Sequence, residues 1–115
     1  MRTLNDYFIS GRISDISTAG STFVAVPDGG RIIKIMTVLQ GAISGGNAAI
    51  TFEIGGTAVT NAGITVAHSG SAVGTMEGSV PTALNEVEED GSIEMITDGN
   101  STGAKALDVT FVIRR

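Results

Sequence analysis

The stretch Pro27–Ile43, PDGGRIIKIMTVLQGAI, decides the fold class because it joins a turn to a long apolar run. Its first four residues, PDGG, are typical of a tight turn. The residues from Arg31 to Gln40 then predict a β-strand that is apolar on both faces. One face would carry Ile33, Ile35, Thr37 and Leu39, and the other Ile32, Lys34, Met36 and Val38. Because a small domain normally exposes one such face to water, the stretch raises the question of what covers the second.

Strand signals recur about every ten residues and are separated by glycine-rich turns. The predicted strands are TFVAV (22–26), RIIKIMTVLQ (31–40), AAITFEI (48–54), TAVT (57–60), GITVA (63–67), TMEGSV (75–80), SIEMIT (92–97) and AKALDVTFVIRR (104–115). The 16 glycines support this interpretation, because glycine adopts the positive φ of hairpin turns and weakens helices. Only ALNEVEED (83–90) is compatible with a helical turn. The pattern predicts an all-β, single-domain sandwich or barrel of about eight antiparallel strands.

Residues 1–21 differ in character, because their apolar side chains follow neither a period of 2 nor one of 3.6. We predict an N-terminal arm over 1–21, followed by one β-sandwich domain over 22–115. Two alternatives stay open for this segment. It could form a short first strand at the edge of the sheet, or a helical turn over Thr3–Ile9.

Composition narrows the classes of function. The chain has 115 residues, which fits one domain, and it is 42% hydrophobic but only 4% aromatic. Sugar sites and single-stranded nucleic-acid platforms rely on exposed aromatic rings, and this chain has few. The net charge is −5 and the seven basic residues are scattered, so we expect no nucleic-acid partner. The absence of cysteine excludes disulfides and thiolate metal sites.

Neither a signal peptide nor a membrane helix is predicted. The N-terminal sequence MRTLNDYFISGRISD lacks the continuous apolar run of a signal peptide. No window approaches the roughly 20 apolar residues that a membrane helix needs. We therefore expect a soluble protein that is made in the cytoplasm and has no membrane partner.

His68 is the single histidine and stands beside Ser69. A catalytic triad needs a base, a carboxylate and a nucleophile brought together in space, and adjacency in sequence does not supply that geometry. The surrounding residues also lack the Gly-x-Ser-x-Gly pattern of a nucleophile elbow. One histidine is too few for a metal site of the cupin kind. We therefore expect His68 to be a polar turn residue, with no catalytic residue and no cofactor in the chain.

Two polar segments are candidates for calcium sites. The run NEVEED (85–90) could bind Ca²⁺ through its oxygens, although a solvated loop is the simpler interpretation. The segment DGNSTG (98–103) matches the first positions of an EF-hand loop, but Val109 occupies the twelfth position, where a glutamate belongs. We expect a hairpin turn there, and we predict no metal site.

The order of four stretches resembles the small jelly-roll proteins that decorate, or cement, the heads of tailed bacteriophages. The stretches are VPDGGRIIKIMTVLQGAI (26–43), NAAITFEIGGTAVTNAGITVAHSGSAVG (47–74), PTALNEVEEDGSIEMITDGNST (81–102) and VTFVIRR (109–115). The resemblance covers Phe23 to Arg114. It implies a jelly roll without enzymatic activity or cofactor that forms a homotrimer on the outer surface of the virion and bridges major-capsid subunits.

This resemblance suggests roles for two groups of residues. In a trimer, Ile32, Met36 and Val38 would be covered by a neighbouring subunit, although the arm or a loop of the same chain is an alternative cover. The arm would contact the capsid or a neighbouring protomer through Leu4, Tyr7, Phe8 and Ile9. The alternative function is a receptor- or carbohydrate-binding module of a head fibre or adhesin, which would need a polar and aromatic patch at one loop end.

Overall fold

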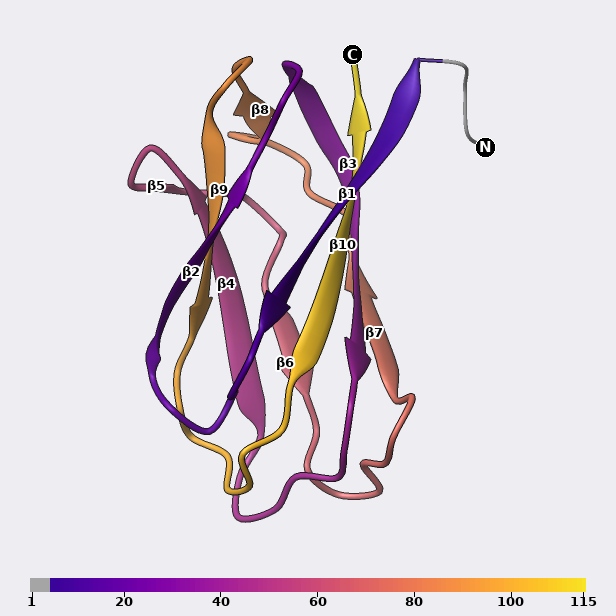
Figure 1. Ribbon diagram of the computed structural model, residues 1–115, viewed down its shortest axis with the longest axis vertical. Coiled ribbons are helices and arrows are strands. Elements are labelled where there is room, and N and C mark those ends of the chain that lie inside the picture. Colours follow the sequence, from indigo (N-terminus) through magenta and orange to yellow (C-terminus); the bar gives the residue numbers. More distant parts are fainter. Residues whose placement is uncertain (1–4) are drawn as a thin grey trace.

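The computed structural model describes residues 5–115 and arranges them in two antiparallel five-stranded sheets. Sheet A contains β1 (Asp6–Ile13), β3 (Gly30–Leu39), β7 (Met76–Ser79), β8 (Glu86–Val87) and β10 (Leu107–Arg114). Sheet B contains β2 (Gly20–Ala25), β4 (Ala48–Ile54), β5 (Thr57–Ala58), β6 (Ile64–Val66) and β9 (Ser92–Thr97). Figure 1 shows the two sheets side by side, with β2, β9 and β4 on the left and β10, β3 and β7 on the right.

The strand order is that of a jelly roll. Sheet A follows the order β1-β10-β3-β7, and β8 also pairs with β3. Sheet B follows the order β2-β9-β4, and β4 then pairs with both β5 and β6. The chain changes sheet between β1 and β2 and again before each of β3, β4, β7, β9 and β10. The predicted all-β sandwich is confirmed.

The core is aliphatic and lies between the two sheets. In β10 every second side chain points into this core, and Leu107, Val109, Phe111 and Ile113 are all buried. Phe111 meets Phe52 of β4 edge to face, with ring centroids 5.6 Å apart and ring planes at 89°. This aromatic pair joins the two sheets at the centre of the sandwich.

In place of the predicted arm, residues 6–13 form strand β1. It pairs with β10 over its whole length, from Asp6 opposite Arg114 to Ile13 opposite Leu107. This is the edge strand that the sequence left as an alternative, and β2 already begins at Gly20. The period of 2 is hard to see in the sequence because Gly11 occupies one inward position. A Cβ there would collide with side chains of sheet B, so the close approach of β1 requires glycine.

A β-bulge in β3 reverses the direction of one predicted interface residue. The register of the β10–β3 pair shifts between Val112 and Ile113, which leaves Ile33 as the extra residue on β3. Side chains before the bulge therefore point to the opposite face from the one that strict alternation predicts. Ile32 is 0% exposed and belongs to the core. The prediction that Ile32 shares an outer face with the other two interface residues is wrong.

The segment 83–90 forms β8 and its flanking turns instead of a helical turn. Within residues 5–115, no helix has the length and the apolar character that crossing a membrane requires.

Candidate interaction surface

The outer face of sheet A carries an exposed apolar patch on β3 and β7. Val38 lies opposite Met76 in the register, and Met36 lies opposite Gly78. Met76 is 52% exposed, and Val80, which directly follows β7, is 57% exposed. Met36 and Val38 are half-buried. We call Met36, Val38, Met76 and Val80 the A-face patch.

A second apolar group lies on the same face at the β1 side. Phe8 is 60% exposed and lies opposite Val112 of β10. Val112 also lies opposite Lys34 of β3 and is only 2% exposed, although it points away from the core. Because the sheet order places β1 and β7 at its two sides, Phe8 and the A-face patch flank the same row of outward side chains.

A hydrogen-bonded charge pair lies beside the A-face patch, because Asp108 of β10 is opposite Arg12 on one side and Val38 on the other. Arg12 binds Asp108 through Nε at 2.7 Å and Nη2 at 3.0 Å. Asp108 also accepts a hydrogen bond of 2.9 Å from Gln40 Nε2. The hydrogen bonds that Arg12 donates to the carboxylate lower the pKa of Asp108 and raise the pKa of Arg12. Lys34 points outward on the same face, so Arg12, Asp108 and Lys34 together carry a net positive charge on a chain whose net charge is −5.

The outer face of sheet B is different. Glu53 of β4 lies directly opposite Glu94 of β9, so two acidic side chains are neighbours across the strands. Ser21 Oγ donates a 2.6 Å hydrogen bond to Glu94 Oε2. Thr65 points outward from β6, and Phe23, which is 63% exposed, lies opposite Glu94. This face is polar and acidic, with one exposed aromatic ring.

The four predicted arm contacts do not act together. Tyr7 and Ile9 point inward and pack against the core, whereas Phe8 points outward. Tyr7 donates a hydrogen bond to the carbonyl of Asp28, and the guanidinium of Arg115 lies 4.6 Å from the centre of its ring. Burial is the main cause of a raised pKa at Tyr7. Leu4 lies outside the described residues.

The structure therefore brings Met36, Val38 and Phe8 onto one face and moves Ile32 into the core. It adds Met76 and Val80, which the sequence interpretation did not select. The signal for these two was present in TMEGSV, where apolar residues stand at the first and last positions of a period-2 pattern with glycine between them.

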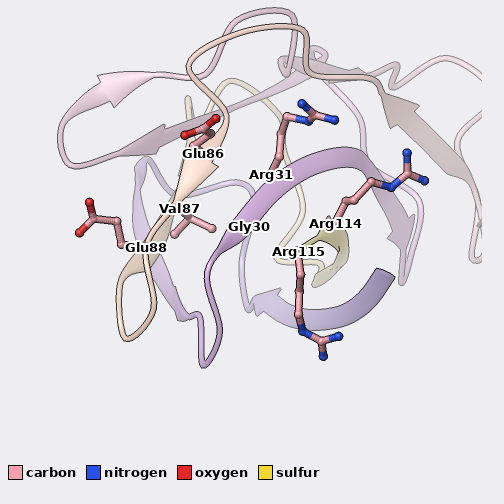
Figure 2. A pocket seen from close by; sticks show the side chains of 7 residues that line it. All are labelled: Gly30, Arg31, Glu86, Val87, Glu88, Arg114 and Arg115. Carbon is pink, nitrogen blue, oxygen red and sulfur yellow. The ribbon is translucent and has the colours of Figure 1, made fainter. Parts of the chain in front are cut away.

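One hollow in the described surface lies where β3 begins. It is lined by Gly30, Arg31, Glu86, Val87, Glu88, Arg114 and Arg115. Figure 2 shows that the three arginine side chains point in different directions. Arg114 binds Asp6 at 2.8 Å and Arg115 binds Asp28 at 2.6 Å. Because two arginines are paired within the chain and two glutamates share the lining, the hollow offers no concentrated positive charge for an anion.

His68 and the segment 98–103 lie in loops, whereas the segment 85–90 contains β8 and the buried residues Asn85 and Val87. His68 Nδ1 is 2.8 Å from Asn47 Oδ1 in such a loop. Asp98 Oδ1 accepts hydrogen bonds from the backbone of Ala49 and Asn100, so this carboxylate serves the turn before β10. Among residues 5–115, no group of three or more His, Cys, Asp or Glu side chains has an arrangement that could hold a metal ion.

Comparisons with known proteins show a similarity of fold and no similarity to a known family. The sequence matches no protein-family model, and no curated protein matches it. The chain is similar to one in the acidic stable capsid structure of the Helicobacter pylori bacteriophage KHP30, with a TM-score of 0.63 and 9% identity over 96% of this chain and 87% of that one. The fold is therefore one that also occurs in a bacteriophage capsid.

Two further structures are more distant. The disulfide-linked pili of Bacillus endospore appendages give a TM-score of 0.44 and 17% identity over 95% of this chain and 86% of that one. The P-domain of Macrobrachium rosenbergii nodavirus gives a TM-score of 0.37 and 9% sequence identity over 95% of this chain and 92% of that one. These TM-scores are too low to indicate that either structure shares the fold of this chain.

Proposed function

We propose that this chain is a non-enzymatic structural protein of a tailed-bacteriophage head, which decorates and cements the outer surface of the capsid as a homotrimer. The A-face patch carries the proposal, because a regular sheet face with contiguous exposed apolar side chains is typical of a protein contact. The jelly-roll order and the similarity to a chain of a phage capsid structure support a place in a virion.

The A-face patch is the proposed seam between subunits. In a closed trimer each patch meets a different surface of the next copy, since a three-fold contact is head to tail. Burying about 100 Å² of apolar surface stabilises such a contact by roughly 2.5 kcal/mol before the cost of association. Met36, Val38 and Met76 from each copy are the residues that would provide this area.

The proposed cementing is mechanical. A trimer that touches two or more major-capsid subunits adds contacts across the seams of the shell, and these contacts must break before the shell opens. Phe8 is the one predicted arm residue among 5–115 that is free to contact the shell, because Tyr7 and Ile9 face the core. The negative net charge suits an outer position, away from packaged DNA.

The alternative of a carbohydrate-binding module gains no support from the aromatic residues. All five rings of the chain lie in strands: Tyr7, Phe8, Phe23, Phe52 and Phe111. The two most exposed, Phe8 and Phe23, lie on different sheets. A sugar-stacking platform at a loop end would need rings that the loops lack. Reproducible hits on a glycan array would favour this alternative over cementing.

Heat resistance of heads tests the proposal. Heads filled with DNA and carrying this protein are expected to release their DNA at a higher temperature than heads without it, and adding the purified protein should restore the difference. Equal resistance of the two kinds of head would contradict cementing. Light scattering of the free protein is expected to give three times the 11.7 kDa chain, 35.1 kDa, or a multiple of that mass. A monomer at high concentration would contradict the trimer.

A further inference from the structure

Strand β1 leaves one row of backbone groups open at the edge of sheet A. In an antiparallel pair, successive residues direct their N–H and C=O groups alternately toward the partner strand and away from it. Two hydrogen bonds fix this alternation for β10. Arg115 N donates to the carbonyl of Asn5 at 3.2 Å, and on the other side of β10, Gln40 N donates to the carbonyl of Ala106 at 3.0 Å.

Both hydrogen bonds identify the same residues of β1 as those whose backbone groups face β10. With the printed register, Tyr7, Ile9, Gly11 and Ile13 direct their backbone groups toward β10. Phe8, Ser10 and Arg12 direct theirs away from the sheet, and all three residues are exposed. Within residues 5–115, no backbone hydrogen bond joins these three residues to a segment other than β10. The open edge therefore offers three donors and three acceptors in one line.

This edge has few of the features that usually prevent strands from pairing, because its two charged side chains, Asp6 and Arg12, are each paired with a residue of β10. Natural sheets protect their edges with short strands, prolines, lysines or bulges. β1 is eight residues long, contains neither proline nor lysine, and pairs with β10 without a register shift. At the opposite edge β7 has only four residues, and Asn61 Nδ2 donates to the carbonyl of Val80 just beyond it.

The free edge of β2 in sheet B is a poorer partner for its own copy. Val26 N donates to the carbonyl of Gly91, so Ser21 and Phe23 direct their backbone groups outward in the same way. Pairing two β2 strands would extend one sheet face that already carries Glu94 and Glu53 next to each other. Four carboxylates would then lie in one band, which like-charge repulsion opposes.

We propose that β1 pairs antiparallel with β1 of a second copy, about a two-fold axis at Ser10, so that the two A sheets become one. Ser10 then lies opposite Ser10, and Phe8 of each copy lies opposite Arg12 of the other. This register keeps like charges apart and places a guanidinium beside an aromatic ring. The pairing stands on the edge geometry alone. Its role, which is to link trimers in pairs on the shell, rests on the proposed function.

Ser10→Pro tests the pairing with little cost to the fold. Proline removes the outward N–H of Ser10, and the bonds between β1 and β10 do not use that group. Both hydrogen bonds of the central Ser10 pair disappear, so we expect two-fold association to weaken roughly 30-fold. Ser21→Pro is the matched control, because it removes an outward N–H from the edge of β2. Light scattering should show assemblies that contain even numbers of chains for the wild type and for Ser21→Pro, but half that number for Ser10→Pro.

Amide hydrogen exchange gives a second measurement on the unmodified chain. At concentrations where copies associate, the amides of Phe8, Ser10 and Arg12 should exchange slowly, and dilution should make them fast. The amides of Ile9 and Gly11, which bond to β10, should stay slow at both concentrations. The proposal is overturned if the three outward amides stay fast in the associated sample, or if Ser10→Pro leaves the mass unchanged. If Ser10→Pro remains a trimer, the β1 pairing and the proposed three-fold seam are two independent contacts.

Discussion

The outer faces of sheets A and B are built from the same alternation, yet they present opposite chemistry. On sheet A, Met36 and Val38 of β3 and Met76 of β7 point outward beside Lys34, and Met76 is 52% exposed. On sheet B, Glu53 and Glu94 lie opposite each other and Thr65 faces water. The inward half of each strand is determined by the shared core. The outward half is therefore where a partner can be recognised. Sheet A presents several neighbouring apolar side chains that gain from leaving water, whereas sheet B presents the single ring of Phe23 beside acidic groups.

The same charge placed on each outer face should have different consequences for association. Met36→Glu puts a carboxylate inside the proposed seam, where burying an unpaired charge is costly. We expect subunit association to weaken at least about 100-fold. The matched variant Thr65→Glu puts a carboxylate on the outer face of sheet B and should leave association unchanged. Sedimentation at several concentrations measures both.

Thermal unfolding of the same two variants serves as the control. Both substitutions are on outer faces, so both should keep the cooperative unfolding of the wild type. If Thr65→Glu weakens association as much as Met36→Glu does, the distinction between the two faces is wrong.

The ion pair between Asp6 and Arg114 predicts that a polar contact on sheet A contributes more to the free energy of unfolding than an exposed one on sheet B. The side chain of Asp6 is 1% exposed, and Arg114 holds it through Nε at 2.8 Å and Nη2 at 3.1 Å. Asp6→Ala leaves the guanidinium without this partner, and we expect a loss of about 2 kcal/mol in the free energy of unfolding. Ser21→Ala, which removes the hydrogen bond to Glu94 on sheet B, should cost less than about 0.5 kcal/mol because that pair is exposed. Urea denaturation of both variants tests this order, and an equal loss would contradict it.

The pair between Arg12 and Asp108 predicts a smaller, pH-dependent effect. Its hydrogen bond lowers the pKa of Asp108 in the folded chain, so the unfolded chain binds the proton more readily. The contribution to stability is therefore present above the ordinary aspartate pKa of about 3.9 and is lost as the pH falls below it. Between pH 6 and pH 3, the wild type should lose more stability than Asp108→Asn. Parallel curves for the two chains would show that the pair contributes nothing.

The smallest predicted effect is a gain on sheet B. Glu53→Gln removes one of two like charges that lie directly opposite each other, which should stabilise the fold by about 0.3 kcal/mol. High salt screens the repulsion, so the gain should shrink as salt is added. Differential scanning calorimetry at two ionic strengths measures it. If the gain in stability does not depend on salt, it comes from packing and not from the removal of a charge.

The sequence predicts the sandwich well because several strands alternate cleanly. The pattern of Ile50 and Phe52 in β4 holds in the structure, as does the alternation in β10. The bulge at Ile33 was not predictable, because it arises from the register with β10, a strand about 75 residues away along the chain. Strand β1 was obscured for a related reason: Gly11 interrupts its pattern, and contacts with sheet B explain why glycine is there.

The candidate surface was predicted only in pieces. Met36 and Val38 were recognisable as a second apolar face on one strand. Their neighbours Met76 and Phe8 come from strands on either side of the sheet, and only the order β1-β10-β3-β7 brings them onto the same face. A single sequence does not contain that order, so the surface as a whole needed the structure.

Hydroxyl-radical footprinting of the associated protein reports on the outer faces of both sheets in one sample. Met76 on sheet A is 52% exposed in the single chain and Phe23 on sheet B is 63% exposed, so both side chains are accessible before association. As the concentration rises into the range where copies associate, Met76 should lose its reactivity while Phe23 keeps its own. Protection of Phe23 with continued reactivity of Met76 would contradict the account.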